Sequence, residues 1–238
     1  MRRIDDIDRY LRATLAAERV QGAAPGPPDR HPFVTISRQA GTGAHPLAEA
    51  MVDVFSARPE EDLFSGWQVY DRTLCELVAR EPRFARSFDS LVEEEYRSKT
   101  DDFFHQMLRS TVDQKMVMDR TFLVVRAIAG MGKSIIVGRG GSFVTKDMPL
   151  GISLRLVSPD EYRIERAMRV HDLNEREARS GAKKRDADRA RMIKKHFGAD
   201  ISDPAGYDVT FNVASVDYHT IGSAVAALVA ARAKEQIP

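Results

Sequence analysis

Short apolar runs alternate with amphipathic stretches along this chain, and no other feature of the sequence constrains its fold as strongly. Five runs have the length and the β-branched or aromatic content of strands: residues 33–37, 67–70, 134–137, 152–157 and 208–213. Helical patterns separate them, and we expect helices over residues 46–55, 84–130, 158–170 and 221–233. Strands separated by helices predict an α/β fold with a parallel sheet, and a ligand of such a sheet binds at the carboxyl ends of the strands.

The helix that follows residue 157 has a recognisable start. Ser158 is expected to cap it, with Pro159 in the first turn and Glu161 three residues after the cap.

The first 30 residues differ in pattern from the rest of the chain. Residues 4–20 have apolar positions at helical spacing, and residues 22–28 contain two glycines and three prolines, which is a linker composition. We therefore expect an N-terminal amphipathic helix and linker over residues 1–30 and an α/β domain over residues 31–238. The helix packs either on that domain or on a second subunit, as in a homodimer, and the sequence leaves both open.

Charge and cysteine content exclude several classes of protein. A net charge of +1 over 238 residues gives no global attraction to nucleic acid or to a membrane surface. The single cysteine, Cys75, cannot form an internal disulfide, which fits a reducing compartment, and we expect it to be buried. No apolar run approaches the ~18 residues of a membrane span, and residues 1–6 do not resemble a secretory signal. The expected location is the cytoplasm.

A glycine-containing segment, residues 37–45, joins the first strand to the first helix. Backbone N–H groups of a glycine turn and of a helix N-terminus attract phosphate, so a P-loop belongs here. The segment departs from the G-x-x-x-x-G-K-[ST] consensus. Arg38 replaces the first glycine, Ala44 the lysine, and His45 the hydroxyl residue. Taken alone, the segment is either a phosphate-binding loop or an ordinary turn between a strand and a helix.

Gly132-Lys133-Ser134 matches the end of the same consensus in the wrong context. Ala127 stands where the first glycine should be, and a helix precedes the segment while a strand follows it. The C-terminus of a helix repels anions. We interpret Lys133 as a cation that ends the helix.

Four motifs follow one another in a characteristic order and spacing. They are the loop ISRQAGTGA at 36–44, Tyr70-Asp71, the strand end VGRGG at 137–141, and a region from Arg155 to Phe211 that includes RDADRA at 185–190 and DPAGYD at 203–208. Together they resemble the cytidylate kinase-like family, whose loop also lacks the usual lysine. The resemblance covers roughly residues 33–235.

The resemblance implies a P-loop NTPase fold of the nucleoside monophosphate kinase type. This is a three-layer α/β architecture with a five-stranded parallel sheet, a helical acceptor region at about 71–130 and a mobile lid at about 171–198. It also implies transfer of the ATP γ-phosphoryl group to CMP or dCMP with Mg²⁺, although the metal ligands stay unspecified.

The resemblance also implies roles for particular residues. Phosphoryl transfer needs positioning and positive charge, which arginine supplies by pairing with phosphate oxygens. The expected cofactor-binding residues are Ser37, Arg38, Gly41, Thr42, Gly43, Ala44 and His45. The expected catalytic residues are Arg139, Arg185, Asp188 and Arg189, and the expected substrate-binding residues are Asp71, Arg139, Arg163 and Arg166. Each also has a purely structural interpretation, such as a tight turn, a helix cap or an ion pair.

Several functions remain open on the sequence. An active (d)CMP kinase fits the arginines, whereas the loss of the lysine at Ala44 favours a nucleotide-binding regulator without catalysis. A kinase for another small phosphoacceptor also fits, because residues 84–130 contain no motif that identifies cytosine. A nucleic-acid-binding protein fits less well, since the basic lid lacks interleaved aromatic residues apart from Phe197. We expect nucleotide partners, and neither nucleic acid nor a membrane.

Overall fold

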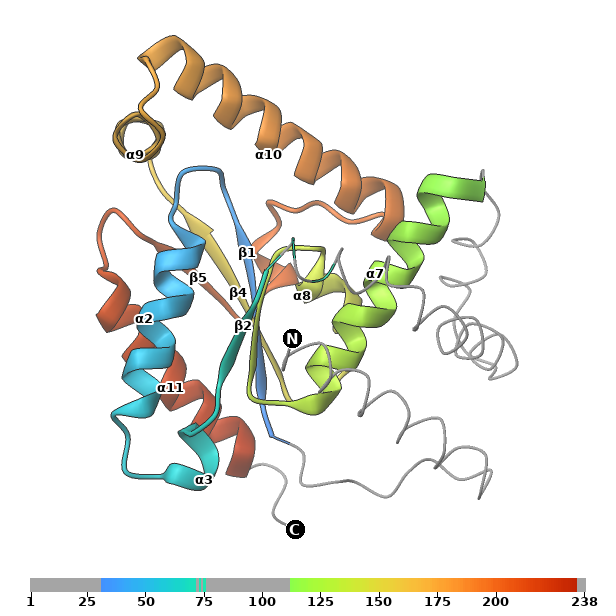
Figure 1. Cartoon of the computed structure of the whole chain (residues 1–238), viewed down its shortest axis with the longest axis vertical. Helices are drawn as coiled ribbons and strands as arrows, with labels where there is room; N and C mark the ends of the chain where they lie inside the picture. Colours follow the sequence, from blue (N-terminus) through green and yellow to red (C-terminus); the bar gives the residue numbers. More distant parts are fainter. Residues whose placement is uncertain (1–30, 72, 74, 76–111, 235–238) are drawn as a thin grey trace.

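Five strands form one parallel sheet in the order β2-β3-β1-β4-β5 (Figure 1). The computed structural model describes residues 31–71, 73, 75 and 112–234. The strands are β1 (Phe33–Arg38), β2 (Gln68–Tyr70), β3 (Ser134–Val137), β4 (Gly151–Val157) and β5 (Val209–Asn212). All four strand pairs are parallel. The predicted five-stranded parallel sheet is therefore confirmed, with each strand within one or two residues of its predicted bounds.

Helices cover both faces of the sheet and give three layers (Figure 1). The helices are α2 (Ala44–Ser56), α3 (Glu61–Phe64), α7 (Val112–Met131), α8 (Gly141–Val144), α9 (Asp160–His171), α10 (Glu175–Phe197) and α11 (Tyr218–Lys234), with a 3₁₀ turn η1 (Pro204–Gly206). Val34 and Ile36 of β1 join one core with α2 and α11, whereas Phe33 joins a second core with α7. Alternate residues of the central strand thus point into opposite layers, as the pleat requires.

The starts of helices α9 and α10 are defined by their N-terminal residues. Helix α9 begins at Asp160 with Pro159 at its N-cap and no side-chain cap, so the prediction that Ser158 caps it is wrong. Pro159 has an extended ψ of 148°, which delays the helix by one residue, and the Ser158 N–H instead donates to Gln39 Oε1 over 3.0 Å. Helix α10 starts with a capping box between Asn174 and Glu177.

The predicted lid region contains one 23-residue helix, α10, which crosses above the carboxyl ends of the strands (Figure 1). The Gly132-Lys133 segment lies at the amino-terminal end of β3, and the parallel sheet therefore separates it from the glycine loop. There the Lys133 N–H donates to Pro32 O and its carbonyl accepts from Gln68 N. Cys75 is buried, as predicted.

Some predictions lie outside the described residues. These are the N-terminal helix and linker at 1–30, with the proposed dimer contact, and the part of the acceptor region at 76–111. Within the described ranges, no helix is both long and apolar enough to cross a membrane.

Candidate functional site

The loop between β1 and α2 requires glycine at two positions. Gly41 has φ of +87° and Gly43 has φ of +76°, both in the left-handed region that favours glycine. A Cβ at Gly41 would lie 2.6 Å from the Arg163 carbonyl oxygen, and one at Gly43 would lie 1.9 Å from Tyr218 Oη. Helices α9 and α11 therefore pack directly on the loop backbone.

The same loop presents a run of free hydrogen-bond donors. Among the described residues, no acceptor is found for the backbone N–H groups of residues 41–45. Other polar groups of the loop are partnered: the Thr42 hydroxyl donates to Gln39 O over 2.9 Å, and Tyr218 Oη donates to Thr42 O over 3.0 Å. Free amides at the positive end of the α2 dipole form the arrangement that binds phosphate.

Helices α9 and α10 hold the next part of the loop from above. Asp186 of α10 accepts the Ala40 N–H over 2.7 Å, and the Ala40 carbonyl accepts from Arg163 Nη1 over 3.0 Å. The Asp186 carboxylate also pairs with Arg163 over 2.7 Å and with Arg189 over 3.0 Å. Arg189 Nη1 donates to the Arg38 carbonyl over 3.4 Å. One carboxylate therefore joins the loop to two guanidinium groups.

The pKa values of the two arginines bound to Asp186 are shifted in opposite directions. Burial lowers the pKa of Arg163, but the hydrogen bonds that it donates to Asp160 and Asp186 outweigh this effect, so the pKa is raised. Burial also lowers the pKa of Arg189; the neighbouring Arg185 and Arg155 add to this effect, and Asp186 opposes it without cancelling it. Arginine stays charged at any physiological pH, so Arg189 is a cation that a further anion would stabilise.

A second buried network lies beneath the loop, and sequence analysis had not identified it. Arg155 of β4 is 7% exposed and donates to Ser37 Oγ over 2.9 Å. Ser37 Oγ lies 3.0 Å from Tyr207 Oη, which donates to the Ile201 carbonyl over 2.9 Å. Because the only Tyr207 hydroxyl proton goes to Ile201, Ser37 donates to Tyr207. Burial raises the pKa of Tyr207 and lowers that of Arg155.

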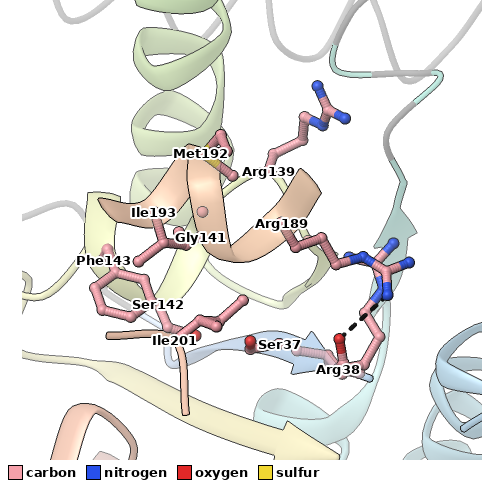
Figure 2. A pocket seen from close by; sticks show the side chains of 13 residues that line it. Ser37, Arg38, Arg139, Gly141, Ser142, Phe143, Arg189, Met192, Ile193 and Ile201 are labelled. Atoms are coloured by element: carbon pink, nitrogen blue, oxygen red, sulfur yellow. Dashed lines mark hydrogen bonds between the residues drawn. The ribbon is translucent and has the colours of Figure 1, made fainter. Parts of the chain in front are cut away.

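Three of the predicted arginines line one pocket above β1 and β3 (Figure 2). Figure 2 shows Arg38 and Arg189 extending toward one another and Arg139 projecting away from both. Arg38 packs on Gly138, where a Cβ would lie 1.8 Å from its Nη1. Arg139 has φ of +54°, a left-handed value that is uncommon for a residue with a side chain. Such strain at a strand end is typical of functional sites.

Other predicted residues do not face the loop. Asp188 is exposed and pairs with Arg191 over 2.9 Å on the outer side of α10, because it lies about 200° around the helix from Asp186. Arg185 is also exposed, and its guanidinium folds back along Gly181 of the same helix.

The remaining predicted residues lie either at the loop or in a separate pocket. At the loop, the Thr42 and Ala44 side chains are buried, and the Arg166 guanidinium lies against Gly43. His45 and Asp71 line a separate pocket between α2 and β2 together with Glu49 and Asp53. In the described ranges, no group of three or more acidic, histidine or cysteine side chains could hold a metal ion.

Comparisons with known proteins identify relatives of the chain. A family model described as the cytidylate kinase-like family matches residues 33–215. An uncharacterized protein from Eubacterium ventriosum is similar in structure, with a TM-score of 0.67 and 18% identity over 85% of this chain and 99% of that one, which is evidence for the fold alone. A shikimate kinase from Bacteroides thetaiotaomicron has a TM-score of 0.41 and 12% identity over 82% of this chain and 95% of that one, too low to carry an argument. No curated protein matches the chain.

The packing on the loop leads to a stability prediction. Gly43→Ala and Gly66→Ala impose almost the same backbone strain, because φ is +76° and +77°, but nothing lies within 4 Å of a Cβ at Gly66. We expect Gly66→Ala to lower the free energy of unfolding by about 1 kcal/mol. Gly43→Ala should lower it by about 1–3 kcal/mol more, because Tyr218 must move. Urea denaturation measures both, and equal losses would contradict the packing described for the loop.

Proposed function

The chain belongs to the cytidylate kinase-like family, and from that premise we propose that it transfers the γ-phosphoryl group of ATP to a nucleoside monophosphate, CMP or dCMP. The observation that carries this proposal is the run of free loop N–H groups at residues 41–45, lying beside the guanidinium groups of Arg163 and Arg189. Phosphoryl transfer depends on positioning and electrostatic stabilisation, and both are supplied by amides and arginines.

The loop fits the phosphates of ATP better than it fits a metal ion. Its free amides would bind phosphate oxygens, and Arg38 and Arg189 would supply the charge that Ala44 cannot. The Ser37 hydroxyl is engaged with Tyr207 and the Thr42 side chain is fully buried, so neither loop hydroxyl is free for Mg²⁺ in this arrangement. Mg²⁺ would therefore be held mainly by phosphate oxygens and water, which is common for this ion.

The proposed reaction assigns different work to the two sides of the site. Helix α10 would cover the phosphates and exclude water, with Arg189 directed at the moving phosphoryl group. Arg139 projects away from the loop at the strained end of β3, where it would hold the monophosphate of the acceptor. Arg166 lies against the loop and would contact ATP. Arg185 and Asp188 are exposed and would take part only after a movement of α10.

A second candidate is a nucleotide-binding regulator without catalysis. The observation that favours it is Ala44, which stands at the lysine position, is 5% exposed and belongs to the core beneath the loop. Transfer to a different small phosphoacceptor is a third candidate, since residues 84–130 contain no motif that identifies cytosine.

A panel of acceptors separates these candidates. With ATP and Mg²⁺ in a coupled assay, we expect ADP to form with CMP and dCMP, and much more slowly with AMP, GMP or UMP. ATP binding without turnover on any acceptor would instead favour the regulator. Turnover only with a phosphoacceptor that is not a nucleotide would favour the third candidate.

Arg189→Ala tests the role of α10 in the transfer step. We expect kcat to fall about 10²–10³-fold, the loss typical when one electrostatic donor to a transition state is removed, while the Kd of ATP changes only a few-fold. Arg191→Ala is the matched control, because Arg191 lies on the same helix and is 73% exposed in its pair with Asp188. Equal losses in kcat and in ATP affinity would contradict a transition-state role.

Arg139→Ala tests the acceptor side. Loss of a charge-assisted contact with the monophosphate should raise the KM of CMP about 10–100-fold and lower kcat, with the Kd of ATP little changed. Steady-state kinetics with varied CMP measures this, and unchanged kinetics would remove Arg139 from the acceptor site.

A further inference from the structure

Asp186 makes the contacts that a phosphate oxygen would make at such a loop. Its Oδ1 accepts the Ala40 N–H over 2.7 Å and pairs with Arg189 over 3.0 Å, and its Oδ2 pairs with Arg163 over 2.7 Å. A backbone amide next to the glycine turn and two guanidinium groups are a typical set of donors for a phosphate group. A side chain of the protein itself thus fills part of an anion site.

The guanidinium groups around Asp186 outnumber the described carboxylates that are bonded to them. Three guanidinium groups lie around Asp186, those of Arg155, Arg163 and Arg189. The described carboxylates bonded to them are those of Asp186 and of Asp160, which pairs with Arg163. In the part of the chain that the structure describes, Arg155 has Ser37 as its hydrogen-bond partner and no carboxylate within salt-bridge distance. An additional anion would therefore be stabilised here, most strongly one of high negative charge.

A polyphosphate bound to the free loop amides would compete with the Asp186 carboxylate. The free N–H groups begin at Gly41, directly after the amide that Asp186 occupies. A polyphosphate bound to residues 41–45 would bring its negative oxygens close to the Asp186 carboxylate, and like charges at such distances repel strongly in a partly buried site. The phosphate would also compete for Arg189.

We propose that Asp186 is an internal counter-anion of the loop: its carboxylate holds Arg163, Arg189 and the loop in this arrangement, and a polyphosphate displaces it on binding. This inference rests on the proposed function, because it requires the loop to bind phosphate. Displacement frees Arg189 to bind the phosphate and releases the contact between α10 and Ala40. Phosphate binding and the position of α10 are then coupled through one carboxylate.

The matched variants are Asp186→Asn and Glu175→Gln. Asparagine retains the shape and an acceptor oxygen at position 186 but removes the competing charge. Glu175 lies on the same helix and pairs with Arg179 over 2.8 Å, with both side chains exposed, so its variant removes a carboxylate far less involved in packing. Calorimetric titration with inorganic tripolyphosphate at fixed ionic strength gives the Kd of each variant and of the wild-type protein.

We expect Asp186→Asn to bind tripolyphosphate about 10-fold more tightly than the wild-type protein, the magnitude of a typical coupling between charged sites, and Glu175→Gln to change the Kd less than 2-fold. Equal or weaker binding by Asp186→Asn would overturn the inference and would leave the phosphotransferase standing if the wild-type protein binds. Tighter binding with no turnover on any acceptor would support the inference and contradict the proposed activity. No binding by any variant would overturn both.

A measurement on the wild-type protein covers the case in which Asp186→Asn does not fold. The ¹³Cγ resonance of Asp186 reports the surroundings of its carboxylate. Tripolyphosphate should shift it if the carboxylate leaves Ala40 and Arg189. A resonance that stays in place while the loop amides shift would overturn the displacement.

Discussion

The hydrogen bond between the Ala40 amide and the Asp186 carboxylate joins the parts of the site that the rest of the chain brings together. On one side of it are β1, the glycine turn and the N-terminus of α2, which together present free N–H groups. On the other side is α10, with Arg189 one turn after Asp186. Arg163 of α9 contacts both sides through the Ala40 carbonyl and Asp186. A loop that lacks the usual lysine is in this way surrounded by arginines from helices distant in sequence.

The sheet was predictable from sequence because its strands are short apolar runs separated by helical periods, and burial on both faces of a parallel sheet leaves that pattern little freedom. The face of α10 that meets the loop was not predictable. Asp186 and Asp188 are two acidic residues in one basic helix, and only the packing of that helix on Ala40 distinguishes them. The i, i+3 spacing of Asp186 and Arg189 was the available signal, whereas Asp188 adjoins Arg189 in sequence and pairs with Arg191 on the outer side of the helix.

Arg155 was missed for a related reason. It interrupts an otherwise apolar strand, but its partner Ser37 lies on β1 and its neighbour Tyr207 precedes β5. Contacts between strands depend on register, and register requires the folded sheet. Arg139 was predicted at the end of β3 and lies there, and its left-handed φ became visible only in the structure.

The central claim is that the amides of residues 41–45 bind phosphate under α10. Its most direct test is a titration of the ¹⁵N-labelled protein with ATP and Mg²⁺, followed by the amide resonances of the whole chain. The account predicts that the largest and saturable shifts fall on Gly41, Thr42, Gly43, Ala44 and His45, with accompanying shifts at Ala40 and along α10. Saturable shifts confined to other segments, with the loop amides unmoved, would contradict it.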